Sequence, residues 1–344
     1  MSLDLPPRFH VYSVEWRASL NRVPTDYALI APERLINFVT EVFTTSGMEE
    51  KKAVQLAGIL VTNDMRGVFS HGSQQCANYS HHFRHGQLDP GAEVTKVRES
   101  PTTLVLDGGG GLGYFPCLQA VESLVTKARN CGIAVATTTN HGHFGAAGIY
   151  ARIPLPEGML CYVTSGHQLN LTSESFVMAA AGGSPMAFGI PCREEPHFLL
   201  DFGAVHDMYL GPEDMRRIVE MVPSTVLRSF GLGCACQALG GLLCGVPLDA
   251  ERAKRTWPGA NQGSLMIVID IKAIADLDDF LDEMDEYSRR VRATIPLPGI
   301  DSACLPGTVE ERLLQRSRQH GIPYGERHAA VLSSLAEELG MRAP

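Results

Sequence analysis

Hydrophobic residues change their spacing twice along this chain, and the changes divide it into helical ends and a strand-rich middle. Over residues 32–85, apolar side chains recur every three or four positions, which is the period of an amphipathic helix. Over residues 94–270, short runs rich in β-branched residues predominate, which is typical of a sheet. Helical spacing returns after residue 309. This order predicts termini that pack together around an inserted central α/β domain.

The expected elements follow from these periods. Helices are predicted over residues 32–44, 49–63, 74–85, 117–130, 212–221, 230–243, 277–293, 309–320 and 327–339. Strands are predicted over residues 94–97, 102–107, 133–139, 159–164, 186–191, 198–201 and 264–270. We therefore expect an N-terminal arm over 1–30, a helical domain from 31–98 and 294–344, and an α/β domain over 99–293.

Composition narrows the classes of function. Hydrophobic residues make up 44% and charged residues 19% of the chain, as in ordinary globular proteins. The longest apolar stretches, such as 179–191, fall short of the roughly 20 residues of a membrane helix. A net charge of −9 gives no reason to expect nucleic acid, so small molecules or proteins are the expected partners. The nine cysteines include no Cys-x-x-Cys pair, which indicates reduced thiols and a cytoplasmic location.

The segment Gly108–Gly113 satisfies the pattern G-x-G-x-x-G between a predicted strand and a predicted helix. One interpretation is a standard dinucleotide-binding turn, which needs an acidic residue at the end of the next strand to hold the ribose. That strand ends in Thr139-Asn140 without an acid or an arginine. The other interpretation, which we favour, is a structural turn that needs positive φ angles.

Two residues far apart in the sequence are candidates for acid–base chemistry. His71 follows a predicted helix within Ser70-His71-Gly72, where an accessible imidazole can titrate near neutrality and protonate an alkoxide. Asp201 follows the apolar run Phe198-Leu199-Leu200, so a strand could carry its carboxylate into the protein to orient a histidine. The alternatives are an exposed loop histidine and a strand-end turn residue.

The remaining motifs give little support for a metal site or for hydrolytic chemistry. His141 and His143, together with His81 and His85, could form a metal site, but no carboxylate or cysteine spacing accompanies them. We therefore predict no metal. The chain has no Gly-x-Ser-x-Gly, no P-loop and no His-Glu-x-x-His, so the usual sequence grounds for a hydrolase, a nucleotidase or a zinc protease are missing.

Taken in order, several motifs resemble those of the malate/L-lactate dehydrogenase family, which also contains ureidoglycolate dehydrogenases, diketogulonate reductases and cyclic imino-acid reductases. Arg66–Gly72 is similar to the family's R-G-V-x-S-H-G, and Asn140–Gly145 to N-S-N-H-F-G. Gly182–Pro191 is similar to G-T-N-P-x-A-x-x-I-P, and Phe198–Asp201 to F-V-L-D. The match keeps this order over roughly residues 30 to 340, which makes it more specific than any one motif.

The resemblance implies an α/β fold with a non-Rossmann cofactor domain over 99–293, whose sheet is mixed and largely antiparallel, plus a helical domain from the terminal segments. It also implies NAD or NADP as cofactor and a homodimer with active sites between domains and subunits. Ser70, His71 and Asp201 match the family's catalytic relay, with His71 as proton donor. Thr164 and Gln75 match substrate positions. The matching cofactor positions are His143, Phe144, Gly145, Ala146, Ala147, Phe198, Leu199, Leu200, Leu227 and Arg228.

The chain departs from the family pattern at its anion and cofactor contacts. An arginine of the family is replaced by Gln75, which leaves Arg66 or Arg228 as candidates to hold a substrate carboxylate. Further departures are Ser184, Val205, Thr308, a shortened stretch between 205 and 228, and prolines 154 and 156 in a stretch that is helical in relatives. The leading hypothesis is hydride transfer between NAD(P) and a 2-hydroxy/2-keto acid or related imino substrate. The alternative is a non-catalytic relative that acts as a binding or regulatory protein.

Overall fold

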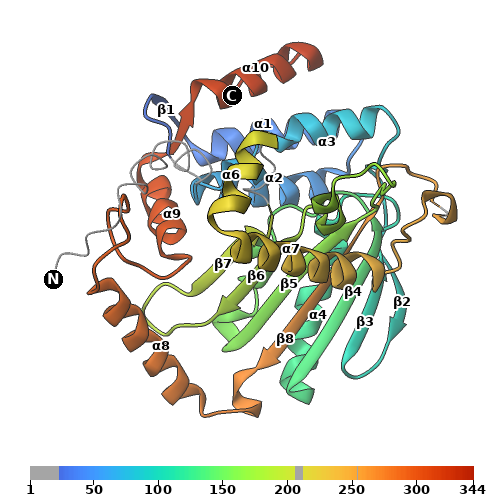
Figure 1. Cartoon of the computed structure of the whole chain (residues 1–344). Helices are drawn as coiled ribbons and strands as arrows, with labels where there is room; N and C mark the ends of the chain where they lie inside the picture. The colour runs from blue at the N-terminus through green and yellow to red at the C-terminus, as the bar shows by residue number, and fades with distance from the viewer. Residues whose placement is uncertain (1–22, 206–211, 254) are drawn as a thin grey trace.

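Strand pairing organises the centre of the molecule into one seven-stranded sheet (Figure 1). The computed structural model describes residues 23–205, 212–253 and 255–344. The sheet has the order β2-β3-β4-β8-β5-β6-β7, and only β3 and β4 run parallel. The predicted mixed, largely antiparallel sheet is confirmed. Its strands are β2 (Thr95–Glu99), β3 (Thr103–Asp107), β4 (Ile133–His141), β5 (Met159–His167), β6 (Pro185–Ile190), β7 (Phe198–Gly203) and β8 (Gln262–Asp270).

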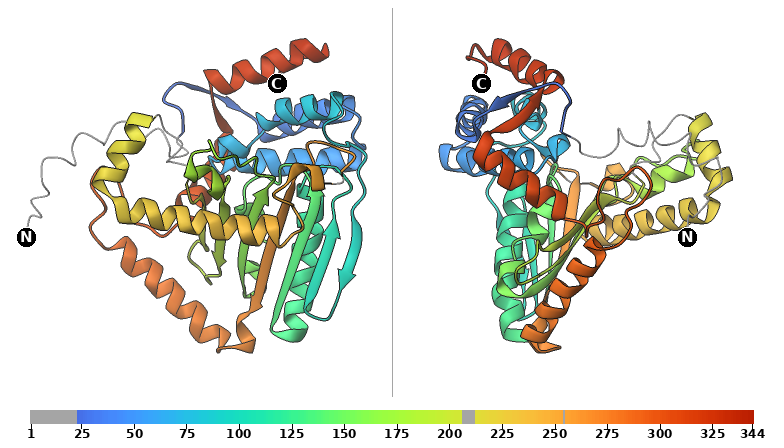
Figure 2. Two further views of the ribbon diagram at one scale, coloured as in Figure 1. Left: turned by 45° about the vertical axis from the view of Figure 1, so that its right-hand side comes forward. Right: turned by 90° about the vertical axis from the view of Figure 1, so that its left-hand side faces the viewer.

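The two faces of this sheet are covered by different helices. Helix α4 (Tyr114–Cys131) packs its apolar side against β4 and β8, and the short α5 (Gly148–Ala151) lies against β5, β6 and β7. Helix α7 (Pro223–Gln237) contacts β5 and β6. Seen along the sheet in Figure 2, α4 and α7 lie on opposite sides. Side chains that alternate along one strand therefore reach two different environments.

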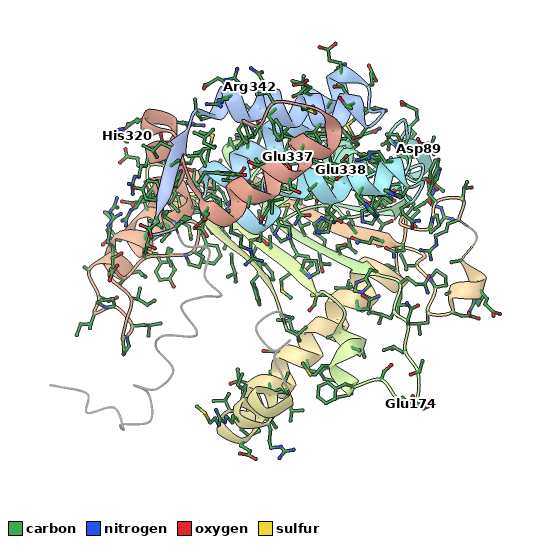
Figure 3. All side chains as sticks on the ribbon, turned by 90° about the horizontal axis from the view of Figure 1, so that it is seen from above. Asp89, Glu174, His320, Glu337, Glu338 and Arg342 are labelled. Atoms are coloured by element: carbon green, nitrogen blue, oxygen red, sulfur yellow. The ribbon has the colours of Figure 1, made fainter. Side chains whose placement is uncertain are left out.

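The terminal segments form a second core at one end of the sheet. It is built from α1 (Pro32–Thr45), α2 (Glu50–Met65), α3 (Gln75–Arg84) and α10 (Glu326–Leu339), with α9 (Thr308–His320) beside α2. Figure 3 shows α10, which carries Glu337 and Glu338, lying across the N-terminal helices. An ion pair of 2.6 Å joins Arg84 to Glu338. The expectation that the two termini pack together is confirmed, because residues from both ends share this core.

A small sheet ties these ends together and was not predicted. Strand β1 (Tyr27–Ile30) pairs antiparallel with β9 (Ile322–Gly325). Each strand has four residues, and β9 contains Pro323, so neither produces a recognisable alternating pattern. Of the predicted arm over 1–30, residues 1–22 lie outside the described part of the chain.

The glycine-rich segment after β3 is a packed turn. The N–H groups of Gly108 and Gly110 donate to the carbonyls of Thr139 and Asn140. A Cβ on Gly110, whose φ is +91°, would lie 2.2 Å from the ring of Trp257. The protein's own atoms therefore fill the space that a phosphate would need, which supports the structural interpretation of this motif.

Helix α7 begins earlier than its sequence pattern predicts, at Pro223 instead of Phe230. Proline suits the first turn of a helix because its missing N–H has no partner there. A π-helical turn, Ala238–Leu242, continues the helix to the predicted end at residue 243. Helix α6 (Pro212–Met221) has the predicted bounds. No described helix is both long enough and apolar enough to cross a membrane.

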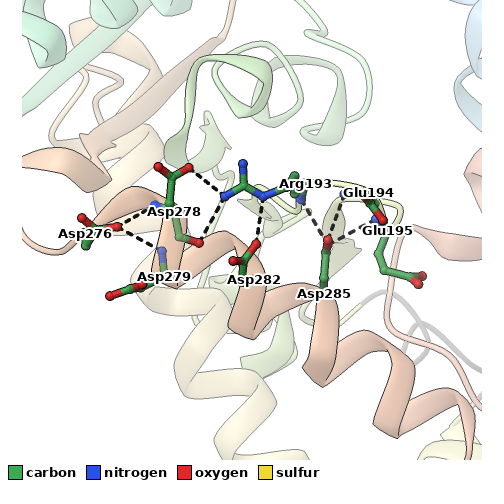
Figure 4. A network of polar contacts seen from close by, with 8 residues as sticks. All are labelled: Arg193, Glu194, Glu195, Asp276, Asp278, Asp279, Asp282 and Asp285. Carbon is green, nitrogen blue, oxygen red and sulfur yellow. Dashed lines mark hydrogen bonds and ion pairs between the residues drawn. The ribbon is translucent and has the colours of Figure 1, made fainter.

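The turn between β6 and β7 is held by α8 (Leu277–Arg292), as Figure 4 shows. The buried carboxylate of Asp285 accepts N–H bonds from Arg193, Glu194 and Glu195 at 3.0–3.2 Å. The Arg193 side chain also pairs with Asp278 and Asp282 at 2.7 and 2.9 Å. These bonds fix the start of β7, which is the strand that carries Asp201.

Candidate functional site

Residues at the end of α2 form hydrogen bonds with the loop that carries His71. The Asn63 amide donates to the carbonyl of His71 at 2.9 Å, and Asp64 Oδ2 accepts the N–H of Ser73 at 2.9 Å. A Cβ on Gly72 would lie 1.7 Å from Asp64 Oδ1, so only glycine allows this approach. Burial raises the pKa of Asp64 to about 7. The backbone around His71 is therefore fixed by buried polar groups.

The His71 side chain lies between a hydroxyl group and a second imidazole. Its Nδ1 is 2.9 Å from Ser70 Oγ, and its ring stacks on that of His143 with centroids 5.4 Å apart. His143 Nδ1 is 2.6 Å from the Tyr79 hydroxyl. Burial, together with nearby His71, lowers the pKa of His143 to about 3, so this second ring is neutral at pH 7.

Asp201 lies on the face of β7 that is covered by α4 and α5. It pairs in register with Ala187, which belongs to the core beneath α4 and α5. Its Oδ2 accepts the N–H of Gly148 at 2.8 Å. Surrounding protein raises the pKa of the Asp201 carboxyl, against lowering by this N–H and by nearby Arg152. Because the residue as a whole is exposed, water limits this rise.

His71 and Asp201 meet opposite ends of one short segment. His71 stacks on His143 at its start, and Asp201 binds the N–H of Gly148 at its end. Residues 143–148 lead from β4 into α5. The tertiary structure therefore brings His71 and Asp201, which are 130 positions apart in the sequence, to the two ends of the segment 143–148. It does not place their side chains in the direct contact that a simple His–Asp dyad would require.

The same segment offers hydrogen-bond donors to a ligand. Phe144 to Ala147 are buried, and in the described residues their backbone N–H groups take part in no hydrogen bond. Buried N–H groups without partners are uncommon, since each costs free energy comparable to a lost hydrogen bond. Oxygen atoms of a nicotinamide dinucleotide would satisfy them, so the residues present here fit the cofactor that the family implies. Phe144 itself stacks on Tyr150 and belongs to the core.

The remaining predicted site residues separate into two groups. Gln75 lies with His71, because its Nε2 donates to the carbonyl of Ser70 at 2.7 Å. Thr164 is fully buried, donates to the carbonyl of Pro185 and pairs in register with Met186, which faces α7. By strand alternation Thr164 lies on the face opposite Asp201. The other positions are Phe198 and Leu200, which are half-buried, Leu199, which is in the core, and Leu227 and Arg228, which are exposed on α7.

The four histidines considered as metal ligands do not lie together in one cluster. His81 stacks on His85 with centroids 4.0 Å apart, whereas His141 contacts Thr138 and the carbonyl of Gly142. The described residues contain no group of three or more side chains that could hold a metal ion.

Sequence reasoning missed Arg152, which follows α5 directly. Its NH1 would lie 3.1 Å from a Cβ on Gly148, and Asp201 Oδ2 would lie 2.7 Å from the same point. The available signal was one cation in an otherwise uncharged stretch between Gly148 and Pro156. Helix α5 ends at Ala151, before Pro154 and Pro156, as prolines in that stretch predict.

These features define a protein in which a histidine-bearing loop and a strand-borne carboxylate flank a segment whose N–H donors bond to none of the described residues, an arrangement suited to proton transfer beside a bound ligand. A family model described as malate/L-lactate dehydrogenase matches residues 30–205 and 211–333. The chain belongs to the malate/L-lactate dehydrogenase family and is an oxidoreductase.

Individual relatives agree with this assignment at low identity. A malate dehydrogenase of Pyrococcus horikoshii is 23% identical over 353 residues, covering 93% of this chain and 98% of the relative. A ureidoglycolate dehydrogenase (NAD(+)) of Escherichia coli is 20% identical over 319 residues, covering 85% and 91%. The solved structure of the Pyrococcus horikoshii OT3 malate dehydrogenase superposes with a TM-score of 0.81 at 22% identity, covering 94% and 99%. The shared fold extends over nearly the whole chain.

Proposed function

We propose that this protein transfers hydride between NAD or NADP and a 2-hydroxy/2-keto acid or a related imino substrate, with His71 as the proton donor. The observation that carries the proposal is the segment 143–148, which His71 contacts at one end and Asp201 at the other. Within the part of the chain that the structure describes, the N–H groups of residues 144–147 between them make no hydrogen bond. The family and the Escherichia coli relative, a ureidoglycolate dehydrogenase (NAD(+)), support a nicotinamide cofactor.

Each residue has a stated task in this proposal. The bound nicotinamide supplies or accepts hydride. His71 gives a proton to the substrate oxygen or nitrogen, or removes it in the reverse direction. Ser70 Oγ and neutral His143 keep the imidazole in one orientation. Asp201 acts through the Gly148 N–H, because that bond holds the cofactor segment against β7.

Cofactor binding is tested by thermal unfolding with NADH and NADPH in separate samples. A ligand present at 100 times its dissociation constant adds about 2.7 kcal/mol of stability. We expect a rise in melting temperature with at least one of the two, followed by cofactor oxidation in the presence of a 2-keto acid. If neither cofactor raises the melting temperature and no substrate supports oxidation, the proposal fails.

We also propose a homodimer. The exposed side of α7 and its π-helical continuation carries Leu227, Leu232, Leu239, Leu242 and Leu243, and Arg228 is the only charged residue between Leu227 and Leu243. Large exposed apolar patches are rare on monomers. A sedimentation or light-scattering mass near twice 37.3 kDa is expected, and Leu227→Glu combined with Leu243→Glu should reduce it to that of a monomer.

A cytoplasmic location is proposed from the cysteines. All nine are free, and most of them are buried. Disulfides are rare in the reducing cytosol. Fractionation of cells that express the full chain tests this, and recovery outside the cytosolic fraction would contradict it.

A further inference from the structure

Arg152 is a half-buried cation that has no bonding partner among the described residues. In the described residues its guanidinium makes no hydrogen bond and no ion pair within 4.0 Å, although Asp201, Glu310 and Glu311 are near enough to influence it. Burial, together with the nearby cation Arg66, lowers the pKa of Arg152 to about 10 against the opposing effect of these carboxylates. A guanidinium has five N–H donors in a planar fork that matches a carboxylate. Leaving such a group desolvated and unpaired is costly, which points to a missing anion.

The neighbouring charges do not satisfy it. Glu311 is already bound to Arg66 at 2.8 Å. Asp201 directs its Oδ2 to the Gly148 N–H. Glu310 raises the pKa of Arg152 but forms no ion pair with it within 4.0 Å. The guanidinium therefore keeps its N–H donors available, while the nearby carboxylates offset part of its charge.

The other candidates for this task are engaged or distant. Arg66 is bound to Glu311, with side-chain exposures of 15% and 34%. Gln75 is uncharged and donates to the Ser70 carbonyl. Arg228 is exposed on α7, on the sheet face opposite Asp201. Both cations named from the sequence are thus less suited than Arg152 to hold an anion beside the segment 143–148.

We propose that Arg152 binds the carboxylate of the substrate, on the side of the site where Asp201 meets Gly148. The inference rests on the proposed function, since it assigns the acid group of that substrate. It makes Arg152 a specificity-determining residue: acids are accepted and the corresponding neutral amides are disfavoured. The short α5 serves this arrangement, because Arg152 immediately follows its last residue and returns toward Gly148 at the start of the same turn.

The kinetic test compares a 2-keto acid that the wild type reduces with the primary amide of that acid, using Arg152→Met and Arg152→Lys. We expect Arg152→Met to raise KM for the acid on the order of 100-fold, with a smaller effect on kcat, and to leave kcat/KM for the amide unchanged. Arg152→Lys should recover part of the loss, since it restores charge without the fork. Equal losses on acid and amide would overturn the proposal, because they would mean that Arg152 acts through Asp201.

A binding test does not depend on turnover. Oxalate, a dianion with two adjacent carboxylates, should bind the wild type in calorimetry and bind Arg152→Met on the order of 100-fold more weakly. Arg129→Met is the matched control, because Arg129 is an exposed arginine paired with Glu157; it should bind oxalate as the wild type does. Melting temperatures of all variants show that they are folded. If oxalate fails to bind the wild type, or binds Arg152→Met equally well, Arg152 is not the anion site, even where NAD(P)-dependent turnover is present. If turnover is absent but oxalate binding depends on Arg152, the proposed function fails separately.

Discussion

The His71 loop and the Asp201 strand place their side chains by different means. The loop is held by the adjacent helix, because the buried side chains of Asn63 and Asp64 form hydrogen bonds with its backbone. The strand is held by elements distant in the sequence. Asp285 of α8 binds the preceding turn, and the N–H of Gly148 binds the Asp201 carboxylate. We therefore expect substitutions in the His71 loop to destabilise the protein. The position of Asp201 depends instead on distant residues that can be changed one at a time.

The largest expected effect is on turnover. His71→Asn should lower kcat by about 10²–10⁴, which is the scale of general acid catalysis, and Asp201→Asn should also lower it by orders of magnitude. Asp107→Asn is the control, since Asp107 is also a strand carboxylate that accepts a glycine N–H, but in the packed turn after β3. Steady-state kinetics with NADH and NADPH measure all three. Unchanged cofactor oxidation in Asp201→Asn would remove Asp201 from the mechanism.

The next effect is on the pH dependence of stability. Folding raises the pKa of Asp64 from 3.8 to about 7, so the folded protein holds this proton more tightly than the unfolded chain. The stabilisation from this proton is complete below pH 4 and is lost as pH rises toward 7. Between pH 5 and 7 the wild type should lose roughly 2 to 3 kcal/mol relative to Asp64→Asn, at about 1.4 kcal/mol per pH unit. Urea unfolding across this range measures it, and parallel curves would contradict the assignment.

Two glycine substitutions compare the loop and the strand directly. Gly72→Ala places a Cβ 1.7 Å from a buried carboxylate oxygen, and Gly148→Ala places one 2.7 Å from the more exposed Asp201 oxygen. We expect Gly72→Ala to cost about 1–3 kcal/mol, as overpacking does, and Gly148→Ala to cost less. Gly148→Ala should instead weaken cofactor binding. Chemical denaturation combined with cofactor titration separates the effects, and the reverse order of stability losses would break the comparison.

The smallest effect concerns the distant support of β7. Asp285→Ala removes a buried acceptor of three N–H groups and should destabilise the protein by about 1–3 kcal/mol. Because β7 carries Asp201, a modest decrease in kcat should accompany it. Arg193→Met, which removes only exposed ion pairs, should have less effect on both. Equal destabilisation by the two variants would contradict this expectation, because it would mean that the buried carboxylate contributes no more than the exposed ion pairs.

The sequence contained enough information for the elements and the fold class, because helix and strand periods depend on neighbouring residues. Most predicted bounds lie within a few residues of those in the structure, and the order of motifs identified the family. The exceptions are short or need a distant partner. Strands β1 and β9 exist only because 27–30 and 322–325 pair across nearly the whole chain.

What the sequence by itself determined is the set of local structures and the chemistry that each can carry, including an imidazole in a turn after α2 and a carboxylate on a strand. Only the tertiary structure decided which groups meet: it put His71 and Asp201 at two ends of one segment, turned Thr164 to the opposite face, and left Arg152 beside Gly148 without a partner among the described residues. The physical reason is that these contacts join residues from separate elements, and hydrophobic spacing along one element carries no information about which side chain a distant element will bring to it.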